Sequence, residues 1–220
     1  MEDRAYAAIT ADIVGSTEYY KANGKPLRPR LLEALAKLNA RHADALAVPF
    51  AITLGDEVQG LVTNPADAPR VVHDLRLQLS PLKCRIGTGI GPIVSELAES
   101  TSQMEGLAFS FSREALDQMK KAKVRATGYR MENGLVEETA NTIASLTDII
   151  QSRWTDKQWE AVRLYAELGD QASVGKRLGV SAQGAEHRLR STQWREIETS
   201  LETLSDLLRR ITEHDLVEWR

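Results

Sequence analysis

The 220-residue sequence predicts a mixed α+β domain followed by an all-helical domain. Short apolar runs alternate with segments of helical spacing over the first part of the chain, which is typical of an α+β domain. All four tryptophans lie beyond residue 153, where glycine becomes sparse and the apolar spacing is helical throughout. We therefore expect an α+β domain at residues 1–131, a helical linker at 132–153 and a helical domain at 154–220.

The first predicted strand is an apolar run that begins at residue 7 and places Asp12 at its exit. The run is short, apolar and β-branched toward its end, which indicates a buried strand. The turn Gly15-Ser16-Thr17 follows it. Gly15 permits a tight turn, and its missing Cβ lets backbone N–H groups approach a ligand.

A second acidic turn lies within residues 50–62, where two predicted strands flank Gly55-Asp56-Glu57 as a hairpin. If this hairpin neighbours the first strand, Asp12 and Asp56 share one end of the sheet. Two carboxylates about 4 Å apart repel by roughly 4 kcal/mol at an effective dielectric near 20, so a shared proton or a bound cation must offset the repulsion. Oxygen ligands beside a phosphate suit Mg²⁺ or Mn²⁺. The alternative is a pair of turn acids that never meet, because Gly-Asp turns are common.

Helical spacing and proline stops predict the remaining elements of this domain. A helix is expected at 30–47, before Pro49, and a second helix ends before Pro81. Further along the chain we expect a strand at 82–90, a helix at about 109–120, a strand at 124–129 and a helix at 133–151. The order strand, helix, hairpin, helix, strand fits a ferredoxin-like or palm arrangement with helices on one face of the sheet.

Caps and glycines delimit the predicted helices of the second domain, which end near residues 168, 178, 192 and 214. Thr155 caps the first of them, and Gly169 closes it. Residues 164–181 have the spacing of a helix-turn-helix, in which Gly179 supplies the left-handed turn and Ser181 caps the recognition helix. The apolar residues expected to pack this motif are Ala172, Val174, Leu178 and Val180.

Local charge favours DNA as the partner of this motif. Residues 173–195 carry five cations against one acid, although residues 153–220 as a whole carry eleven cations and twelve acids. Cations of this kind contact phosphates, and residues near the start of a recognition helix reach base edges. The residues expected to contact double-stranded DNA are Lys176, Arg177, Ser181, Gln183, His187, Arg188 and Arg190, of which Gln183, His187 and Arg188 would read bases. The alternative is a three-helix bundle used only for protein contact.

Composition limits the other classes of function. The net charge of −3 gives no global field that attracts nucleic acid or anionic membrane. The single cysteine, Cys84, excludes an internal disulfide and is expected in the core. The chain opens with acids and no segment approaches 18 apolar residues, so we expect a cytoplasmic protein without a signal peptide or membrane span. The four histidines have no partner at metal spacing and are expected at the surface.

The acidic motifs resemble those of a known family. Residues 12–17 followed by 54–57 are similar to the metal-binding pair of class III nucleotide cyclases, whose domain resembles the palm of polymerases, and residues 84–91 resemble a later strand of these domains. The resemblance, which covers roughly residues 5–130, implies two sets of ligands. Asp12, the Ile13 carbonyl and Asp56 would hold Mg²⁺ or Mn²⁺, and Gly15, Ser16, Thr17 and Gly55 would receive a nucleotide triphosphate. The whole chain resembles the SatD family of bacterial proteins, and its tail resembles the C-terminal DNA-binding region of sigma factors.

The sequence departs from the cyclase pattern at two positions that matter for turnover. Ile52 stands where adenylyl cyclases have a base-reading lysine, and Phe109 stands where the family has a catalytic asparagine. Arg113 matches the arginine of that pair, so the resemblance implies that it can act catalytically by stabilising transition-state charge. Its alternative role is a surface ion pair with Glu114 or Glu105.

Three hypotheses follow. The first is a DNA-binding transcription regulator whose cyclase-like domain senses a nucleotide or a metal. The second is an active nucleotide cyclase or nucleotidyltransferase with a helical accessory domain. The third is a metal-free relic whose sheet mediates assembly. Cyclase-like sites form between two subunits, and one helix-turn-helix usually needs a twin, so a homodimer is expected.

Overall fold

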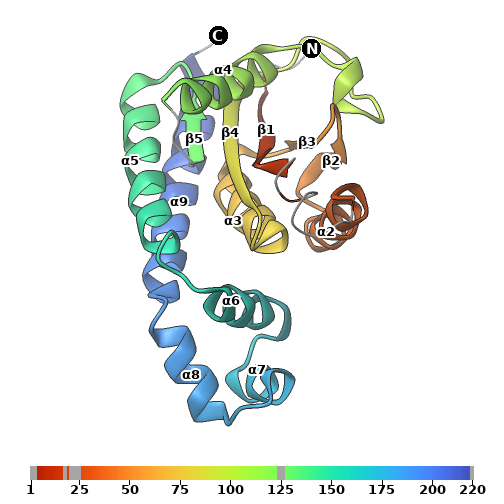
Figure 1. Cartoon of the computed structure of the whole chain (residues 1–220). Coiled ribbons are helices and arrows are strands. Elements are labelled where there is room, and N and C mark those ends of the chain that lie inside the picture. The colour runs from red at the N-terminus through yellow and green to blue at the C-terminus, as the bar shows by residue number, and fades with distance from the viewer. Residues whose placement is uncertain (1–3, 17–18, 20–25, 123–126, 219–220) are drawn as a thin grey trace.

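The computed structural model describes residues 4–16, 19, 26–122 and 127–218, with side chains up to residue 211 (Figure 1). The first part of the chain contains β1 (Ala5–Val14), α2 (Arg28–Arg41), β2 (Leu46–Ile52), β3 (Glu57–Val62), α3 (Ala68–Leu79), β4 (Lys83–Pro92), α4 (Leu107–Lys121) and β5 (Thr127–Arg130). The helices that follow are α5 (Gly134–Gln151), α6 (Asp156–Leu168), α7 (Gln171–Leu178), α8 (Ala182–Arg190) and α9 (Trp194–Glu218).

The described residues form one five-stranded sheet in the order β2-β3-β1-β4-β5. Neighbouring strands are antiparallel except β4 and β5, which run parallel. The order strand, helix, strand, strand, helix, strand along β1 to β4, with β1 between β3 and β4, is the ferredoxin-like arrangement. The predicted α+β fold class is confirmed, and so is the expectation that the hairpin neighbours the first strand.

Helices cover both faces of the sheet, rather than the one face that was expected. Ile9, Ala11 and Ile13 of β1 pack with α2 and α3, and α5 and α9 join the same core. Ala8 packs on the opposite face against Ala108 of α4. Because side chains alternate along a strand, Asp12 lies on the α4 face, where it pairs with a lysine of that helix.

Helix α4 lies against β4 at backbone contact distance. A Cβ added to Gly87 would lie 2.4 Å from the carbonyl oxygen of Ser112, and one added to Gly89 would lie 2.1 Å from that of Ala108. Only glycine leaves room for this approach. The glycine-rich segment at 84–91 is therefore a docking surface for the helix that carries Arg113.

The expected helix at 30–47 is too long at its C-terminal end. The structure ends α2 at Arg41, and β2 begins at Leu46 and includes Pro49. A proline is tolerated there because β2 is an edge strand, and its pairing with β3 shifts register on either side of Val48. The apolar residues after 44 therefore belong to a strand.

The helical part begins and ends its helices close to the predicted residues. Thr155 and Gln158 form a capping box at the start of α6, and Gly169 and Gly179 end α6 and α7 with φ of 78° and 68°. Ala172, expected to pack the second helix, is exposed. Gly175 takes that place, because a Cβ on it would lie 2.9 Å from the Val180 carbonyl oxygen.

Helix α9 connects the helical part to the sheet. Leu201 packs with Trp154 and Ile197 in the helical core, whereas Leu204 and Leu208 pack in the core beneath the sheet. Figure 1 shows α5 and α9 side by side along the left of the sheet, with α9 extending down toward the lower helices. Packing thus crosses the proposed boundary at residues 132–153. Within the part of the chain described here, no helix has the length and apolar character to cross a membrane.

Candidate functional site

Two carboxylates face each other across neighbouring strands near the end of β1. Asp12 is the register partner of Glu57, the first residue of β3. Both side chains are largely buried, with 19% and 11% of their surface exposed. Like charges directly opposite each other on a sheet are destabilising, so this pair needs cations nearby.

Asp12 has two such cations. Arg85 Nη1 lies 3.1 Å from its Oδ2, and Lys120 Nζ lies 3.0 Å from its Oδ1. Arg85 is the register partner of Asp12 on the other neighbouring strand, β4, and Lys120 comes from the last turn of α4. Each carboxylate oxygen therefore has a cation from a different element.

Glu57 is held by Arg113, which meets it with two parallel hydrogen bonds. Nη1 donates to Oε2 at 2.5 Å, and Nη2 donates to Oε1 at 2.7 Å. The Thr53 hydroxyl also donates to Oε1 at 3.2 Å. Burial alone would raise the pKa of Glu57, but the hydrogen bonds and charge of Arg113 lower it below its ordinary value. Arg113 does not take the partner foreseen for an ion pair, Glu114, which contacts Arg130 instead.

A layer of hydroxyl and amide groups lies on the same face, next to these charges. Gln59 Nε2 donates to Thr10 Oγ1 at 2.9 Å, and the hydroxyls of Thr10 and Ser112 are 2.7 Å apart. Ser112 in turn donates to the carbonyl of Gly87 at 3.1 Å. The layer ties β3, β1, α4 and β4 together. It fixes the position of the helix that supplies Arg113 and Lys120.

The other predicted ligands of this site lie around the same end of the sheet. Asp56 is half-buried in the turn just before Glu57, and Gly55 has a φ of 62° with open space around it. Gly15 has a φ of 76° at the exit of β1, followed by Ser16. Thr17 lies outside the described residues. The pairing of β1 with β3 stops at Asp12, so it does not include Ile13. The pairing of β1 with β4 continues to Val14.

The donor set has the chemistry of a magnesium or manganese site but not its arrangement. The candidate ligands are oxygens only, which hard cations prefer. However, no three Asp, Glu, His or Cys side chains of the described residues gather in a way that could hold a metal ion. The carboxylates of Asp12 and Glu57 are already neutralised by arginine and lysine. A metal fits only if those cations release them.

Sequence reasoning did not find Glu57, Lys120 or Arg85 as members of the site. The one available signal was the spacing of Arg113 and Lys120, seven residues apart, which places both on one face of a helix. That α4 turns this face to the two acids depends on the glycines of β4, whose role as a docking surface is visible only in the fold.

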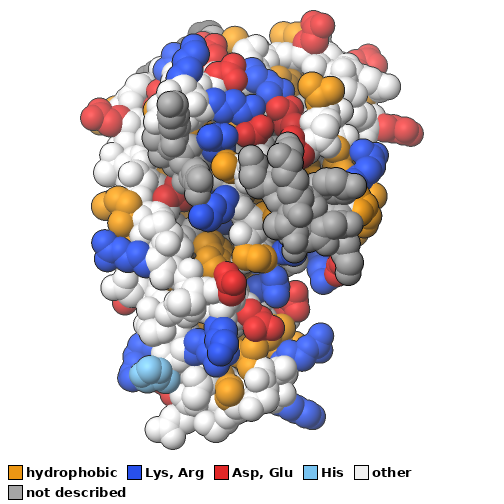
Figure 2. Space-filling model, viewed as in Figure 1, with side chains coloured by type: hydrophobic (Ala, Val, Ile, Leu, Met, Phe, Trp, Pro, Cys, Tyr) orange, Lys and Arg blue, Asp and Glu red, His pale blue; other side chains and the backbone are white. Residues whose placement is uncertain are grey.

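The second candidate surface is formed by α7 and α8, at the end of the molecule away from the sheet (Figure 1). Ser181 caps α8 by accepting a hydrogen bond from the Gly184 N–H at 3.0 Å. Ala185 and Leu189 point into the core, so the outward face of α8 carries Gln183 and His187. Of the residues expected at DNA, Lys176, Arg177, Ser181, Gln183, His187 and Arg190 are exposed and Arg188 is half-buried. Figure 2 shows Lys and Arg side chains along the edges of this lower part.

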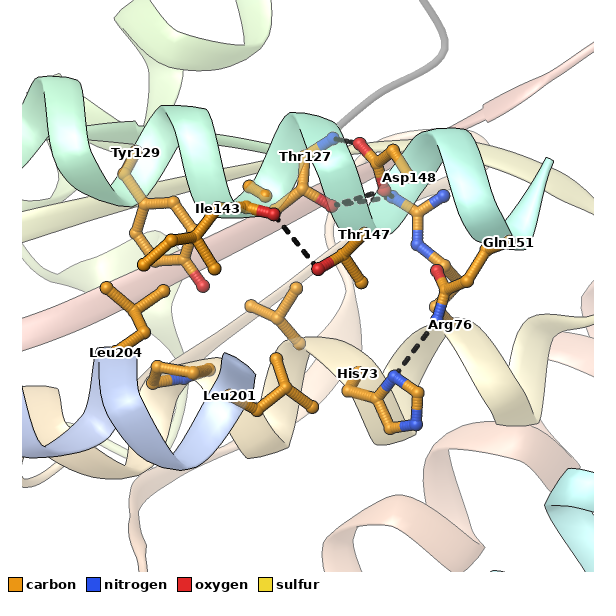
Figure 3. A pocket seen from close by; sticks show the side chains of 13 residues that line it. His73, Arg76, Thr127, Tyr129, Ile143, Thr147, Asp148, Gln151, Leu201 and Leu204 are labelled. Atoms are coloured by element: carbon orange, nitrogen blue, oxygen red, sulfur yellow. Dashed lines mark hydrogen bonds and ion pairs between the residues drawn. The ribbon is translucent and has the colours of Figure 1, made fainter. Parts of the chain in front are cut away.

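One small cavity lies beneath the sheet among α3, α5, β5 and α9 (Figure 3). Its volume is about 20 Å³, which is room for about one water. Figure 3 shows Arg76, Asp148 and Thr127 meeting at one end and His73 with Gln151 at the other. The cavity is too small for a nucleotide.

Several solved structures resemble the chain over little more than half of its length. A bacterial light-regulated adenylyl cyclase is 15% identical, with 57% of this chain and 76% of that chain covered and a TM-score of 0.39. The non-canonical dimeric guanylyl cyclase domain of the RhoGC fusion protein from the aquatic fungus Blastocladiella emersonii is 16% identical, with 59% of this chain and 80% of that chain covered and a TM-score of 0.42. An adenylyl cyclase from P. aeruginosa is 15% identical, with 57% and 76% covered and a TM-score of 0.38.

No curated protein sequence matches the chain. A family model does match it, and the match extends over residues 6–201, from β1 into the first turns of α9. This range includes the acid pair, α4 and the helices α6 to α8. The chain belongs to the SatD family.

Proposed function

We propose that this chain is a DNA-binding transcription regulator whose α+β domain binds a nucleotide, a divalent metal or both. The observation that carries the proposal is the unit formed by α7, a three-residue turn and α8. Its second helix is capped by Ser181, buries Ala185 and Leu189, and turns polar and cationic side chains outward. This arrangement supports a helix-turn-helix in which α8 would be the recognition helix that enters a major groove.

The charges around this unit support contact with duplex phosphates. Lys176 and Arg177 end α7, while Arg188 and Arg190 end α8. Gln183 in the first turn of α8 and His187 in its last turn are exposed and would read base edges. Lys176, Arg177 and Arg190 would position the protein on the DNA backbone. Gln183, His187 and Arg188 would supply sequence preference.

Salt-dependent binding to duplex DNA tests this half of the proposal. Affinity for promoter fragments should fall steeply with salt, and Arg190→Ala and Arg188→Ala should each reduce the salt slope by about 0.9 if they contact a phosphate. Arg153→Ala removes an exposed arginine of the helical part outside α7 and α8, so it should leave the slope unchanged. Equal effects of all three substitutions, or no binding at low salt, would contradict the proposed DNA surface.

The charged cluster at the end of β1 supports the nucleotide half of the proposal. It places carboxylates that can hold a divalent cation beside guanidinium and ammonium groups that can pair with phosphate oxygens. Asp12, the Ile13 carbonyl and Asp56 would hold Mg²⁺ or Mn²⁺. Gly15, Ser16, Thr17 and Gly55 would contact the nucleotide. If the site is catalytic, Arg113 would stabilise negative charge on the phosphate in the transition state.

A thermal-shift screen of nucleoside triphosphates with Mg²⁺ or Mn²⁺ tests this half. A ligand at a hundred times its dissociation constant stabilises a protein by about 2.7 kcal/mol. The stabilisation should vanish in the double variant Asp12→Ala, Asp56→Ala. A variant that is more stable than wild type, together with no ligand shift in wild type, would contradict a metal site at these acids.

An active nucleotide cyclase is the second candidate function. The bidentate contact of Arg113 with Glu57 favours it, because it brings a cation able to stabilise phosphoryl charge to the acid pair. Ile52 and Phe109 weigh against it, since they replace base-reading and catalytic side chains of the cyclase pattern. Product analysis after incubation with ATP or GTP and Mn²⁺ separates an enzyme from a sensor.

We also propose that the chain acts as a homodimer, because a single helix-turn-helix seldom reaches sufficient affinity and specificity. Ligand binding between two α+β domains would then alter the spacing of two copies of α8. Linkage is reciprocal, so a nucleotide that binds tightly yet leaves DNA affinity unchanged would rule out this coupling.

A further inference from the structure

The charged cluster pairs two largely buried acids with three cations, of which the two from α4 are more exposed than the acids. Helix α4 presents Arg113 to Glu57 and Lys120 to Asp12, and Arg85 of β4 completes the second pair. The side chains of Arg113 and Lys120 are 46% and 37% exposed, whereas those of Glu57 and Asp12 are 11% and 19% exposed. A ligand arriving from solvent therefore meets the two cations of α4 before it meets the acids.

Neither a metal nor an anion can enter this cluster without breaking ion pairs. A divalent cation must separate the carboxylates from Arg113 and Lys120, which takes the acid partners away from these two side chains. A polyphosphate must separate the same cations from the carboxylates, which leaves two acids facing each other. Taking the partner away from either largely buried carboxylate is strongly unfavourable because its charge is left uncompensated, whereas the partly exposed cations of α4 lose a smaller stabilisation.

The acids and the cations both regain partners of opposite charge when the metal and the polyphosphate bind together. The carboxylates then face the metal, and the guanidinium and ammonium groups face phosphate oxygens. We propose that Asp12, Glu57, Arg85, Arg113 and Lys120 form a charge-exchange site for a divalent metal–polyphosphate complex, in which the internal ion pairs block binding of either component alone. This inference rests on the proposed nucleotide function and names the regulation of that site.

The position of α4 does not depend on these ion pairs. The helix is held against β4 at Gly87 and Gly89, and the hydroxyls of Thr10 and Ser112 join it to β1. The long side chains of Arg113 and Lys120 can therefore change partners while the helix stays in place. If the ion pairs had only a structural role, they would be needed to hold α4 in place.

Single-charge variants separate exchange from a structural role. Glu57→Gln releases Arg113, so binding of inorganic triphosphate in EDTA should strengthen by about tenfold. Arg113→Gln releases Glu57, so binding of Mn²⁺ alone should strengthen by a similar factor while metal-free triphosphate binding falls. Lys120→Gln should have the same effect as Arg113→Gln, because it releases Asp12. Titration calorimetry measures each affinity, and melting temperatures confirm that each variant is folded.

The control is Arg130→Gln, which removes an arginine that pairs with Glu114 and Glu137 outside the cluster and should change neither affinity. Opposite changes for metal and triphosphate in the Glu57 and Arg113 variants would support exchange. Wild-type protein that binds Mn²⁺ alone and triphosphate alone as tightly as the variants would overturn exchange and leave the nucleotide function intact. Wild-type protein that binds nothing, even with Mn²⁺ and triphosphate together, would overturn both.

Discussion

His73 is a buried titratable side chain at the junction of α3 and α5. Gln151 Nε2 lies 3.1 Å from its Nδ1, at one end of the small cavity in Figure 3. Burial lowers the pKa of His73 from 6.5 to about 4; the neighbouring Asp74 opposes this shift, and Arg70, Arg76 and Arg41 add to it. The imidazole is therefore neutral in the folded protein at neutral pH.

This buried histidine predicts a loss of stability in mild acid. Its folded pKa lies below its unfolded pKa, so the unfolded chain binds more protons between about pH 6.5 and 4. The contribution is fully present above pH 6.5 and is lost as the pH falls toward 4, by up to about 3 kcal/mol. Urea unfolding of wild type and His73→Gln at pH 7, 5.5 and 4.5 should show a smaller pH dependence in the variant.

Two features make this comparison specific to His73. Asp148, whose pKa is raised by burial, contributes a pH dependence of the opposite sign, but it is present in both proteins and cancels in the difference. His187→Gln changes an exposed histidine and should keep the wild-type pH dependence. A His73→Gln variant as acid-sensitive as wild type would show that the imidazole is not the responsible group.

Single residues also show where sequence reasoning reaches its limit. The histidines were expected at the surface, yet His73 is buried, because α9 returns over α3 and covers a face that the apolar spacing of α3 leaves polar. Likewise, adjacent strands were predicted correctly, but the partner of Asp12 depends on register. A shift of one residue decides which side chain faces Asp12, and the hairpin places Glu57 there.

At the scale of elements, the contact of α4 with β4 depends on glycine. Gly89→Ala would place a methyl group 2.1 Å from the Ala108 carbonyl oxygen, and backbone cannot give way cheaply. We expect the free energy of unfolding to fall by at least 1–3 kcal/mol, the usual range for overpacking. Chemical denaturation measures it. Gly134→Ala is the matched control, because nothing lies within 4 Å of a Cβ at the start of α5. Equal stability of the two variants would refute tight docking.

The predictability of elements differs between the two parts of the chain. The helices α6 to α8 were placed within two residues because their ends are written locally, by Thr155, Ser181 and the left-handed glycines. The start of β2 was missed because Pro49 looks like a helix stop and is instead accommodated at a sheet edge. That environment depends on strand order, which local patterns do not contain.

At the scale of the whole molecule, α9 makes the two parts interdependent. Its first turns pack in the helical core with Ile197, and its later turns place Leu204 in the core beneath the sheet. Conversely, Leu77 of α3, which belongs to the α+β part, packs within the helical core. Arg41 of α2 also donates a hydrogen bond to the Ala166 carbonyl of α6 at 2.6 Å. Contacts of α9, Leu77 and Arg41 therefore join the two parts.

This interdependence predicts a single unfolding transition. Trp154, Trp159 and Trp194 pack in the helical core and report the helical part. The one cysteine, Cys84, is buried in β4 and reports the sheet through its reactivity with a thiol reagent. The denaturation curve followed by tryptophan fluorescence should coincide with the one followed by Cys84 reactivity. Leu204→Ala should shift both by the same 2–5 kcal/mol, the usual cost of a buried leucine, although tryptophan and cysteine lie in different parts. Leu146→Ala, at a 59% exposed side chain, should shift neither. Tryptophan exposure that precedes Cys84 reactivity would mean that the helical part unfolds alone, and a ligand bound at the acids would then have no packed route to α8.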